Sequence, residues 1–290
     1  MSFVLTLVAA RGAGLPAGLL DRARDVVRGR IPVVLSPGEA ADIACKERPD
    51  LALVRAALED AAVDALVTRG RGRRKGLLVA DMDGTIVDGE TLDRLAQEVG
   101  VGPEVEAISH SSIDGEVDFA QAMRDRLALL RGVPLAAVER ATAEVRLAPG
   151  ARTLVATMRA HNARTALVSG GFTLFTARVA ALCGFDEHSG NVLVEEDGLL
   201  TGALEEPVLD GPAKRDALCA LRDARGLRAA ATLAVGDGAN DLPMLREAGL
   251  AVAFRARDVV NREVANQVRH ADLRALLFAQ GYPAGVFREE

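Results

Sequence analysis

Aromatic side chains are scarce in this sequence. Of its 290 residues only 3% are aromatic and none is tryptophan, whereas 49% are hydrophobic. The core must therefore be built from Ala, Leu and Val, which suits helices packed on a parallel sheet. The cysteines, Cys45, Cys183 and Cys219, are too few and too far apart for a disulfide scaffold. We expect them to be reduced core residues.

Long apolar runs and an excess of positive charge are also missing. No stretch approaches the ~20 apolar residues of a membrane span, and no basic region precedes the first apolar run. We therefore expect a cytoplasmic protein without membrane insertion. The formal charge of -6 argues against a nucleic-acid partner. The one basic cluster, residues 69–75, has no interleaved aromatic residues and is predicted to be a solvated linker.

Residues 1–70 are predicted to form a small α+β domain. A chain of this length tends to divide into more than one unit, because single cores stop growing beyond roughly 250 residues. Strand and helix patterns alternate here, ending at the basic, glycine-rich segment. The predicted strands are 3–10, 31–35 and 63–67, and the predicted helices are 15–28 and 50–60. Residues 12–17 nominally fit a dinucleotide fingerprint, but a turn is the favoured interpretation.

The rest of the chain is predicted to be a Rossmann-like α/β core interrupted by a helical cap. Residues 76–87 and 147–290 alternate strands with helices, as in an open parallel sheet. Residues 88–146 contain only helical patterns. The predicted cap helices are 91–99, 103–109, 119–130 and 135–145. The predicted core helices are 151–161, 173–182, 213–225 and 242–248. The predicted core strands are 77–80, 165–168, 232–235 and 250–253, with a hairpin at 192–203.

Polar motifs begin where three of the apolar core strands end. Asp-Met-Asp-Gly-Thr (residues 81–85) follows the first strand, Ser-Gly-Gly (169–171) the second, and Gly-Asp-Gly-Ala-Asn-Asp (236–241) the third. Ligands of open parallel sheets bind at the carboxyl ends of the strands, so we expect these motifs to meet at one edge. The second motif alone is typical of an ordinary turn, and in the third Asp241 could simply cap the next helix.

Together with Lys214, these motifs resemble the four signature motifs of the haloacid dehalogenase superfamily of phosphotransferases. From about residue 76 onward the chain is similar, more narrowly, to the phosphoserine phosphatase family. The linked set is far more specific than any one motif. The resemblance implies a Mg²⁺-dependent phosphatase that hydrolyses O-phosphoserine to serine and phosphate, the last step of serine biosynthesis. It implies a small-molecule partner and leaves the oligomeric state open.

The resemblance also implies roles for the carboxylates. Asp81 would be the nucleophile that becomes an aspartyl-phosphate, and Asp83 would be the general acid and base. The Asp81 carboxylate, the Asp83 backbone carbonyl and the Asp237 carboxylate would hold Mg²⁺. Asp241 would support this set by hydrogen bonding. Lys214, which taken alone reads as a surface lysine, would bridge the nucleophile and the phosphate.

The remaining site residues are implied in the same way. Ser169, the Gly170 N–H and Asn240 would contact phosphoryl oxygens. In the cap, Glu90 would bind the substrate ammonium, Arg126 its carboxylate, and Phe119 would cover the entrance. Taken alone, Glu90 and Arg126 read as solvated charges. A guanidinium fork suits a carboxylate and a carboxylate suits an amine, so phosphoserine needs both.

The sequence departs from the phosphoserine phosphatase pattern at two positions. Gly84 stands where these enzymes commonly carry Ser, and Ile113 stands where a Met is expected in the cap. The same chemistry on another small phosphomonoester, such as phosphohomoserine, or phosphoryl transfer therefore stays open. Residues 1–70 resemble a degenerate ACT-type domain, a class that often binds amino acids, so a non-catalytic amino-acid sensor is a further alternative. The intact set of catalytic residues argues against a pure sensor. The histidines, whose spacing does not suit a metal, are expected at surfaces or helix ends.

Overall fold

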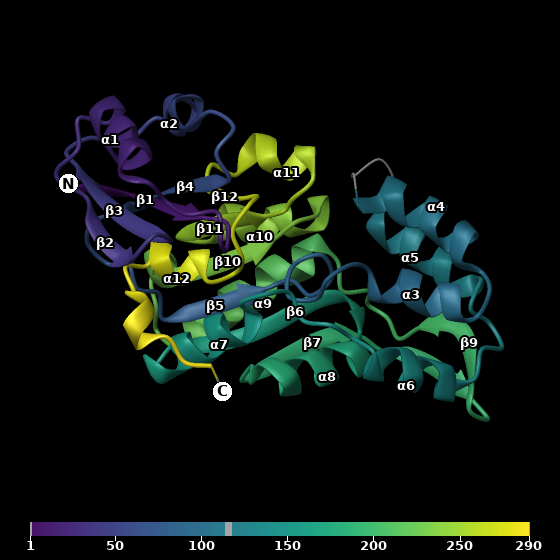
Figure 1. Ribbon diagram of the computed structural model, residues 1–290. Helices are drawn as coiled ribbons and strands as arrows, with labels where there is room; N and C mark the ends of the chain where they lie inside the picture. Colours follow the sequence, from purple (N-terminus) through teal and green to yellow (C-terminus); the bar gives the residue numbers. More distant parts are fainter. Residues whose placement is uncertain (1, 114–117, 290) are drawn as a thin grey trace.

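The structure is a computed structural model that describes residues 2–113 and 118–289, with the backbone alone for 109–113 (Figure 1). The strands are β1 (Phe3–Ala9), β2 (Val33–Ser36), β3 (Ala40–Cys45), β4 (Val63–Arg69), β5 (Leu77–Ala80), β6 (Arg164–Phe172), β7 (Glu187–Asn191), β8 (Leu193–Glu196), β9 (Leu199–Leu204), β10 (Thr232–Gly236), β11 (Leu250–Phe254) and β12 (Gln267–Val268). The α-helices are α1 (Ala17–Val26), α2 (Leu51–Leu58), α3 (Thr91–Glu98), α4 (Gly102–Ile113), α5 (Phe119–Ala128), α6 (Leu135–Ala143), α7 (Ala151–Ala160), α8 (Thr173–Cys183), α9 (Gly211–Ala224), α10 (Leu242–Glu247), α11 (Asp258–Glu263) and α12 (Ala275–Ala279). Short 3₁₀ helices are η1 (Ala229–Ala231), η2 (Ala239–Asp241) and η3 (Ala284–Val286).

The core of the described chain is a parallel sheet with the strand order β12-β11-β10-β5-β6-β7. Side chains along β5 alternate between its two faces. Leu78 and Ala80 join a cluster with residues of α7 and α8, whereas Leu77 and Val79 join one with residues of α9 and α10. Both faces are thus covered by helices, which explains why the strands read as continuous apolar runs. The predicted α/β fold with an open parallel sheet is confirmed.

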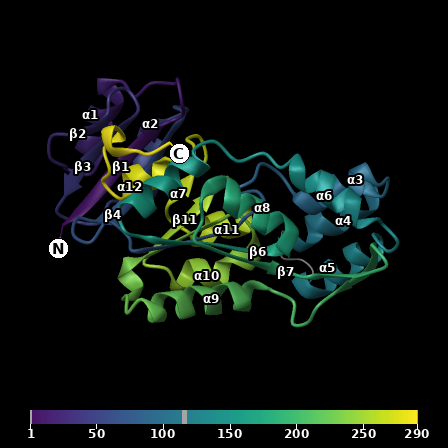
Figure 2. The same cartoon turned by 90° about the horizontal axis from the view of Figure 1, so that it is seen from below.

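The first four strands form a separate antiparallel sheet with the order β2-β3-β1-β4. With α1 and α2 they give the order β-α-β-β-α-β, the ferredoxin-like arrangement. This sheet and the cap helices α3 to α6 lie at opposite ends of the core (Figures 1 and 2). The N-terminal sheet is therefore remote from any site between the cap and the core.

Two residues of the basic cluster, Arg73 and Lys75, pack into a joint between the N-terminal sheet and the core, so the prediction of a solvated linker was wrong for them, whereas Arg69, Arg71 and Arg74 are exposed. Arg73 donates to both carboxylate oxygens of Asp42, at 2.5 and 2.9 Å, and to the carbonyl of Ala279. Lys75 is 9% exposed and donates to the carbonyl of Ala230. The buried Asp64 accepts hydrogen bonds from the backbone N–H groups of residues 269–271. These are long-range contacts, which a local charge pattern cannot reveal.

Two short linkers join the cap to the core and run side by side. Val87 in the first linker and Leu147 in the second form an antiparallel bridge, and the N–H of Ala148 donates to the carbonyl of Ile86 at 2.8 Å. The β8–β9 hairpin extends from the core and contacts the cap. Among the described residues, no helix has both the length and the apolar character needed to cross a membrane.

Sequence patterning missed three strands. β3 is rich in Ala, β12 has two residues, and β7, with the sequence Glu-His-Ser-Gly-Asn, is a mostly polar strand at the edge of the sheet. An edge strand with polar side chains has no periodic apolar signal, because tertiary pairing alone defines it. The predicted helices and the other strands agree with the observed ones to within a few residues. Cys45 and Cys183 are buried and Cys219 is half-buried; all three thiols are free.

Candidate active site

The polar motifs meet in one small cavity at the carboxyl edge of the parallel sheet. β5 lies between β10 and β6, so the residues that follow these three strands are neighbours. The cavity encloses about 50 Å³ between this edge and the cap helices. The residues that line it are Asp81, Asp83, Glu90, Leu92, Phe119, Met123, Arg126, Ser169, Gly170, Gly171, Asp237, Gly238 and Asn240.

Lys214 lies behind this lining as a fully buried cation between two carboxylates. It projects from α9, whose N-cap Asp210 accepts a hydrogen bond from the N–H of Ala213. Its Nζ donates to Asp81 Oδ1 at 2.5 Å and to Asp241 Oδ1 at 2.7 Å. Burial alone would lower the pKa of Lys214, but the two carboxylates raise it above its usual value. The lysine is therefore a fixed positive charge, and the surface interpretation is wrong.

The carboxylates in and around Asp81 carry more negative charge than the cation Lys214 alone can balance. Burial, followed by the nearby Asp241 carboxylate, raises the pKa of Asp81 to about 7, although Lys214 lowers it. Burial and then Asp81 raise the pKa of Asp237 well above its ordinary value. Buried carboxylates have such raised pKa values when a partner cation is needed to stabilise their ionised forms.

Asp241 organises the third motif instead of capping the next helix. Its Oδ2 accepts hydrogen bonds from the N–H groups of Asp237 and Gly238, at 3.0 and 3.1 Å, while Oδ1 accepts from Lys214. The side chain makes no capping hydrogen bond to α10, so the alternative of a simple helix cap is wrong. Thr85 donates from Oγ1 to Asp237 Oδ1 at 2.9 Å and thereby orients that carboxylate.

One carboxylate oxygen from each of Asp81, Asp237 and Asp241 lies within 4.8 Å of the other two. Hydrogen bonds occupy both oxygens of Asp241 but one oxygen each of Asp81 and Asp237. In the described part of the chain, the Oδ2 atoms of Asp81 and Asp237 accept no hydrogen bond. These two oxygens lie in a cluster that has more carboxylates than cations. They are therefore suitable ligands for a hard divalent cation. The residues present therefore suit Mg²⁺, with Asp241 in a supporting position.

The side chain of Asp83 is held by a hydrogen bond from the first residue of the first cap helix. Its Oδ1 accepts a hydrogen bond from the N–H of Thr91, the first residue of α3, at 2.9 Å. Burial raises the pKa of Asp83 to about 6, although the contact with Thr91 lowers it. A carboxyl group with a pKa near neutrality is suited to take up and release a proton. No role for Thr91 could be predicted from the sequence, because a threonine at a helix start is common.

Ser169 and the two glycines after it form a bulged loop at the carboxyl end of β6, where regular pairing with β7 is interrupted, and this loop faces the cavity. Ser169 is 1% exposed, and its Oγ accepts a hydrogen bond from the N–H of Gly171 at 2.9 Å. The ring of Phe119 lies so close to Gly170 that no Cβ could fit there. The cap aromatic therefore covers the loop, as the predicted entrance position requires.

Two opposite charges from the cap complete the lining. Glu90 is the N-cap residue of α3, and Arg126 lies on α5. Burial, and then the neighbouring Asp83, raise the pKa of Glu90 well above its ordinary value. Burial also lowers the pKa of Arg126, which is 4% exposed. Neither residue is a freely solvated surface charge. The side chain of the other cap position considered above, Ile113, lies outside the described residues.

Gly84 is required by its surroundings in this chain. Its φ of +67° belongs to the left-handed region, and a Cβ at this position would lie 2.5 Å from Asp237 Oδ2. Glycine thus allows the backbone of the first motif to approach the Asp237 carboxylate. Glycine stands here in place of the serine of the family pattern, and the absence of a side chain leaves space for Asp237, a candidate metal ligand.

Comparison with known proteins agrees with this geometry. The sequence profile of the haloacid dehalogenase-like hydrolases matches residues 78–246, which include the three strand ends and Lys214. The chain belongs to the haloacid dehalogenase-like hydrolases. The predicted resemblance to this family is therefore confirmed.

Several relatives of this hydrolase are phosphoserine phosphatases. That of Archaeoglobus fulgidus is 36% identical over 212 residues, which are 73% of this chain and 62% of that protein. The hydrolase spans between 54% and 62% of the length of three such relatives. A probable phosphoserine phosphatase from Vibrio cholerae has a TM-score of 0.76 and 27% identity, covering 98% of this chain and 88% of that one. The phospho-aspartyl intermediate analogue of a phosphoserine phosphatase has a TM-score of 0.68 and 35% identity, covering 71% of this chain and 98% of that one.

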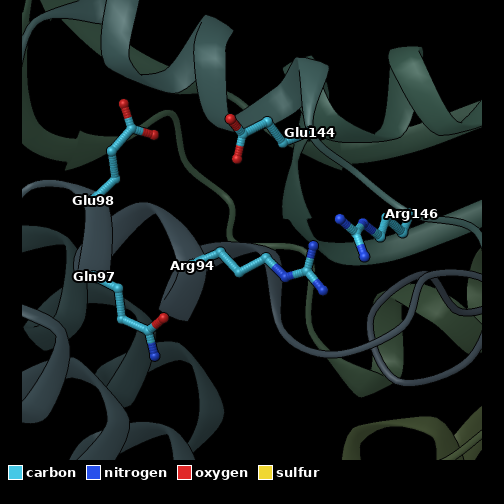
Figure 3. Close-up of a pocket in the computed structure, with 5 residues that line it drawn as sticks. All are labelled: Arg94, Gln97, Glu98, Glu144 and Arg146. Carbon is cyan, nitrogen blue, oxygen red and sulfur yellow. The ribbon is translucent and has the colours of Figure 1, made fainter.

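A larger hollow of the hydrolase, of about 690 Å³, lies near the cap–core linkers and contains none of the predicted site residues. Figure 3 shows the guanidinium groups of Arg94 and Arg146 extending toward each other across it, with Glu98 and Glu144 on the other side. Arg94 donates to the backbone carbonyl of Asp88 in the first linker, at 2.9 Å. The hollow lacks a nucleophile or a buried charge pair, so the small acidic cavity is the better candidate for catalysis.

Proposed function

We propose that this hydrolase is a Mg²⁺-dependent phosphatase that converts O-phosphoserine to serine and phosphate through an aspartyl-phosphate on Asp81. This activity would place it at the last step of serine biosynthesis, in the cytoplasm. The observation that carries the proposal is the convergence, in one cavity, of phosphate-handling groups and two opposite charges from the cap. A phosphomonoester that also carries an amine and a carboxylate matches all of these groups.

In the first half of the reaction, an oxygen of Asp81 forms a bond to phosphorus while the bond from phosphorus to the serine oxygen breaks. Lys214, bonded to Asp81 at 2.5 Å, holds the nucleophile in place and supplies positive charge where negative charge gathers on the phosphoryl group. Ser169 and the N–H groups of its loop contact the phosphoryl oxygens, and Asn240 lines the same wall. The leaving serine oxygen needs a proton.

Asp83 supplies that proton and later removes one from water. Its pKa of about 6 allows a protonated fraction before attack and a carboxylate afterwards. The hydrogen bond from Thr91 holds Oδ1, so Oδ2 is the oxygen directed to the substrate. Water then attacks the phosphorus of the aspartyl-phosphate, which releases inorganic phosphate and regenerates Asp81.

Mg²⁺ would be held by the carboxylates of Asp81 and Asp237 and by the backbone carbonyl of Asp83. When bound, it lowers the repulsion between the phosphate dianion and the carboxylates. Glu90 and Arg126 select the substrate by its ammonium and its carboxylate, and Phe119 excludes water from the loop beneath it.

A substrate panel combined with the Asp81→Asn variant tests this proposal. Phosphoserine should be among the best substrates of the wild-type protein by kcat/KM, in comparison with phosphohomoserine, phosphothreonine and an aryl phosphate. Asp81→Asn should trap no radiolabelled phosphoenzyme in an acid quench. A variant that traps label at the wild-type yield would disprove the nucleophile, and a poor rank for phosphoserine would disprove the substrate.

A further inference from the structure

We infer that Asn191, at the end of the edge strand β7, is a positioning residue that holds the phosphate-binding loop and the lysine helix in register. The inference rests on the proposed function, since it concerns the same phosphate site. Asn191 does not line the cavity, and its side chain is 3% exposed. Its amide makes two hydrogen bonds of 2.7 Å, one to the carbonyl of Gly170 and one from the N–H of Leu209.

The first hydrogen bond compensates for an interruption in the sheet. β6 and β7 pair regularly up to Val168, and the register then shifts before Phe172 pairs with Asn191. Residues 169–171 therefore leave the regular ladder, and the Gly170 carbonyl loses its strand partner. A buried carbonyl without a partner is costly, and the Nδ2 group of Asn191 replaces the missing donor.

This hydrogen bond also sets the direction of the next N–H group. A trans peptide is planar, so the carbonyl of Gly170 and the N–H of Gly171 point in opposite directions. Because Asn191 holds that carbonyl on the far side of the loop, the N–H of Gly171 faces Ser169 and donates to its Oγ at 2.9 Å. Gly190 allows the close approach, since a Cβ there would lie 2.9 Å from the Gly171 carbonyl.

The second hydrogen bond reaches the segment that places Lys214. Asn191 Oδ1 accepts from the N–H of Leu209, and the next residue, Asp210, caps α9 through its side chain. The carbonyl of Asp210 also accepts a hydrogen bond from the N–H of Lys214 at 3.0 Å. One buried amide thus spans the two segments that must grip the same phosphoryl group. Its loss should misalign both, although it touches no reacting atom.

The experiment compares Asn191→Ala and Asn191→Asp with Gln280→Ala in the full-length protein with Mg²⁺. Gln280 is a matched control far from the cavity lining: it is 1% exposed, accepts a hydrogen bond from the N–H of Lys75 and donates to the carbonyl of Leu276. Both alanine variants remove a buried amide that bridges two backbone segments, so both should lower the thermal midpoint. Catalytic losses should appear only at Asn191.

We expect Asn191→Ala to lower kcat/KM by roughly 10- to 100-fold, the range for a small displacement of catalytic groups. Phosphoserine and an aryl phosphate should lose activity equally, because the loop grips the phosphate and not the leaving group. Inhibition by inorganic phosphate should weaken in parallel. Asn191→Asp retains the acceptor for the N–H of Leu209 but cannot donate to the carbonyl of Gly170. The affinity of this variant for inorganic phosphate should therefore fall as well. Gln280→Ala should stay within about twofold of the wild type in kcat/KM.

The inference would be overturned if Asn191→Ala lost stability while kcat/KM and phosphate inhibition remained within twofold of the wild type. It would also be overturned if Gln280→Ala showed the same catalytic losses, since any buried amide would then have the effect. The wild-type substrate panel separates this result from a failure of the proposed function. A wild-type protein that prefers another phosphomonoester would disprove the substrate, and the same ratios measured on that ester would still decide the role of Asn191.

Discussion

Replacing Lys214 with Met would test how the carboxylates of the cavity are balanced. Methionine fills a similar volume without charge, so the variant removes the cation and leaves the packing. In the wild type Lys214 is fully buried and bonded to Asp81 and Asp241, at 2.5 and 2.7 Å. Removing one member of a buried ion pair costs roughly 3–5 kcal/mol, because the remaining charge is left uncompensated. Here two carboxylates, Asp81 and Asp241, would be left without their lysine.

The measurement is thermal unfolding of the metal-free protein in the presence of a chelator. A loss of roughly 3–5 kcal/mol lowers the midpoint by about 6 to 15 °C in a protein of this size. The double variant Lys214→Met with Asp81→Asn should recover about half of the loss, since only Asp241 then remains charged without its lysine. Asp241 would still accept the N–H groups of Asp237 and Gly238, at 3.0 and 3.1 Å.

Arg215→Met is the matched control for this prediction. Arg215 is the next residue on α9 and pairs with the exposed Asp216, an ion pair of the kind that contributes less than about 1 kcal/mol. The thermal midpoint of Arg215→Met should stay close to that of the wild type. If Lys214→Met unfolded at the wild-type midpoint, or if the double variant were less stable than the single one, the lysine would not be the group that balances the carboxylates.

Three further predictions follow from the described contacts. Arg126→Ala should lower kcat/KM for phosphoserine by at least roughly 30-fold but for an aryl phosphate by less than about threefold, since the lost charge pair involves the substrate carboxylate; equal losses would disprove that contact. Gly84→Ser should raise the Mg²⁺ concentration for half-maximal activity by roughly 10-fold, because the new Cβ displaces Asp237; an unchanged titration would show that the loop adapts. Arg73→Met should destabilise the protein by about 2–4 kcal/mol in urea unfolding, since it leaves the buried Asp42 unpaired, while kcat remains unchanged; a decrease in kcat would mean that the N-terminal sheet influences the site.

Much of the site could be predicted because its residues follow apolar strands. Asp81 and Asp237 come directly after β5 and β10, and Ser169 lies among the last residues at the carboxyl end of β6; parallel strands place these ends at one edge whatever the details of packing. Lys214 could be assigned only by resemblance, since a lysine near a helix start carries no local sign of burial. Its burial between two carboxylates became visible only in the structure.

Other functional contacts could not be predicted because they depend on groups far apart in the sequence. Thr91 holds Asp83 through a backbone N–H, which any residue type could provide. Asn191 ends a polar edge strand that patterning missed, and its partners are 21 and 18 residues away. Arg73 lies in a basic run that resembles a linker, yet it pairs with Asp42 across a domain joint.

The sequence by itself determined most of the strand and helix order, though not β3, β7, β12, α11 and α12, and it determined the motifs at the strand ends and the family. These features follow from local apolar periodicity and from residue types at fixed spacing. Only the tertiary structure decided which charges are buried, which carboxylate oxygens remain available for a cation, and which uncharged side chains hold the site in register. Burial and hydrogen bonding depend on segments that folding brings together. The spatial neighbours of Gly84 and Asn191 therefore cannot be predicted from their neighbours in the sequence.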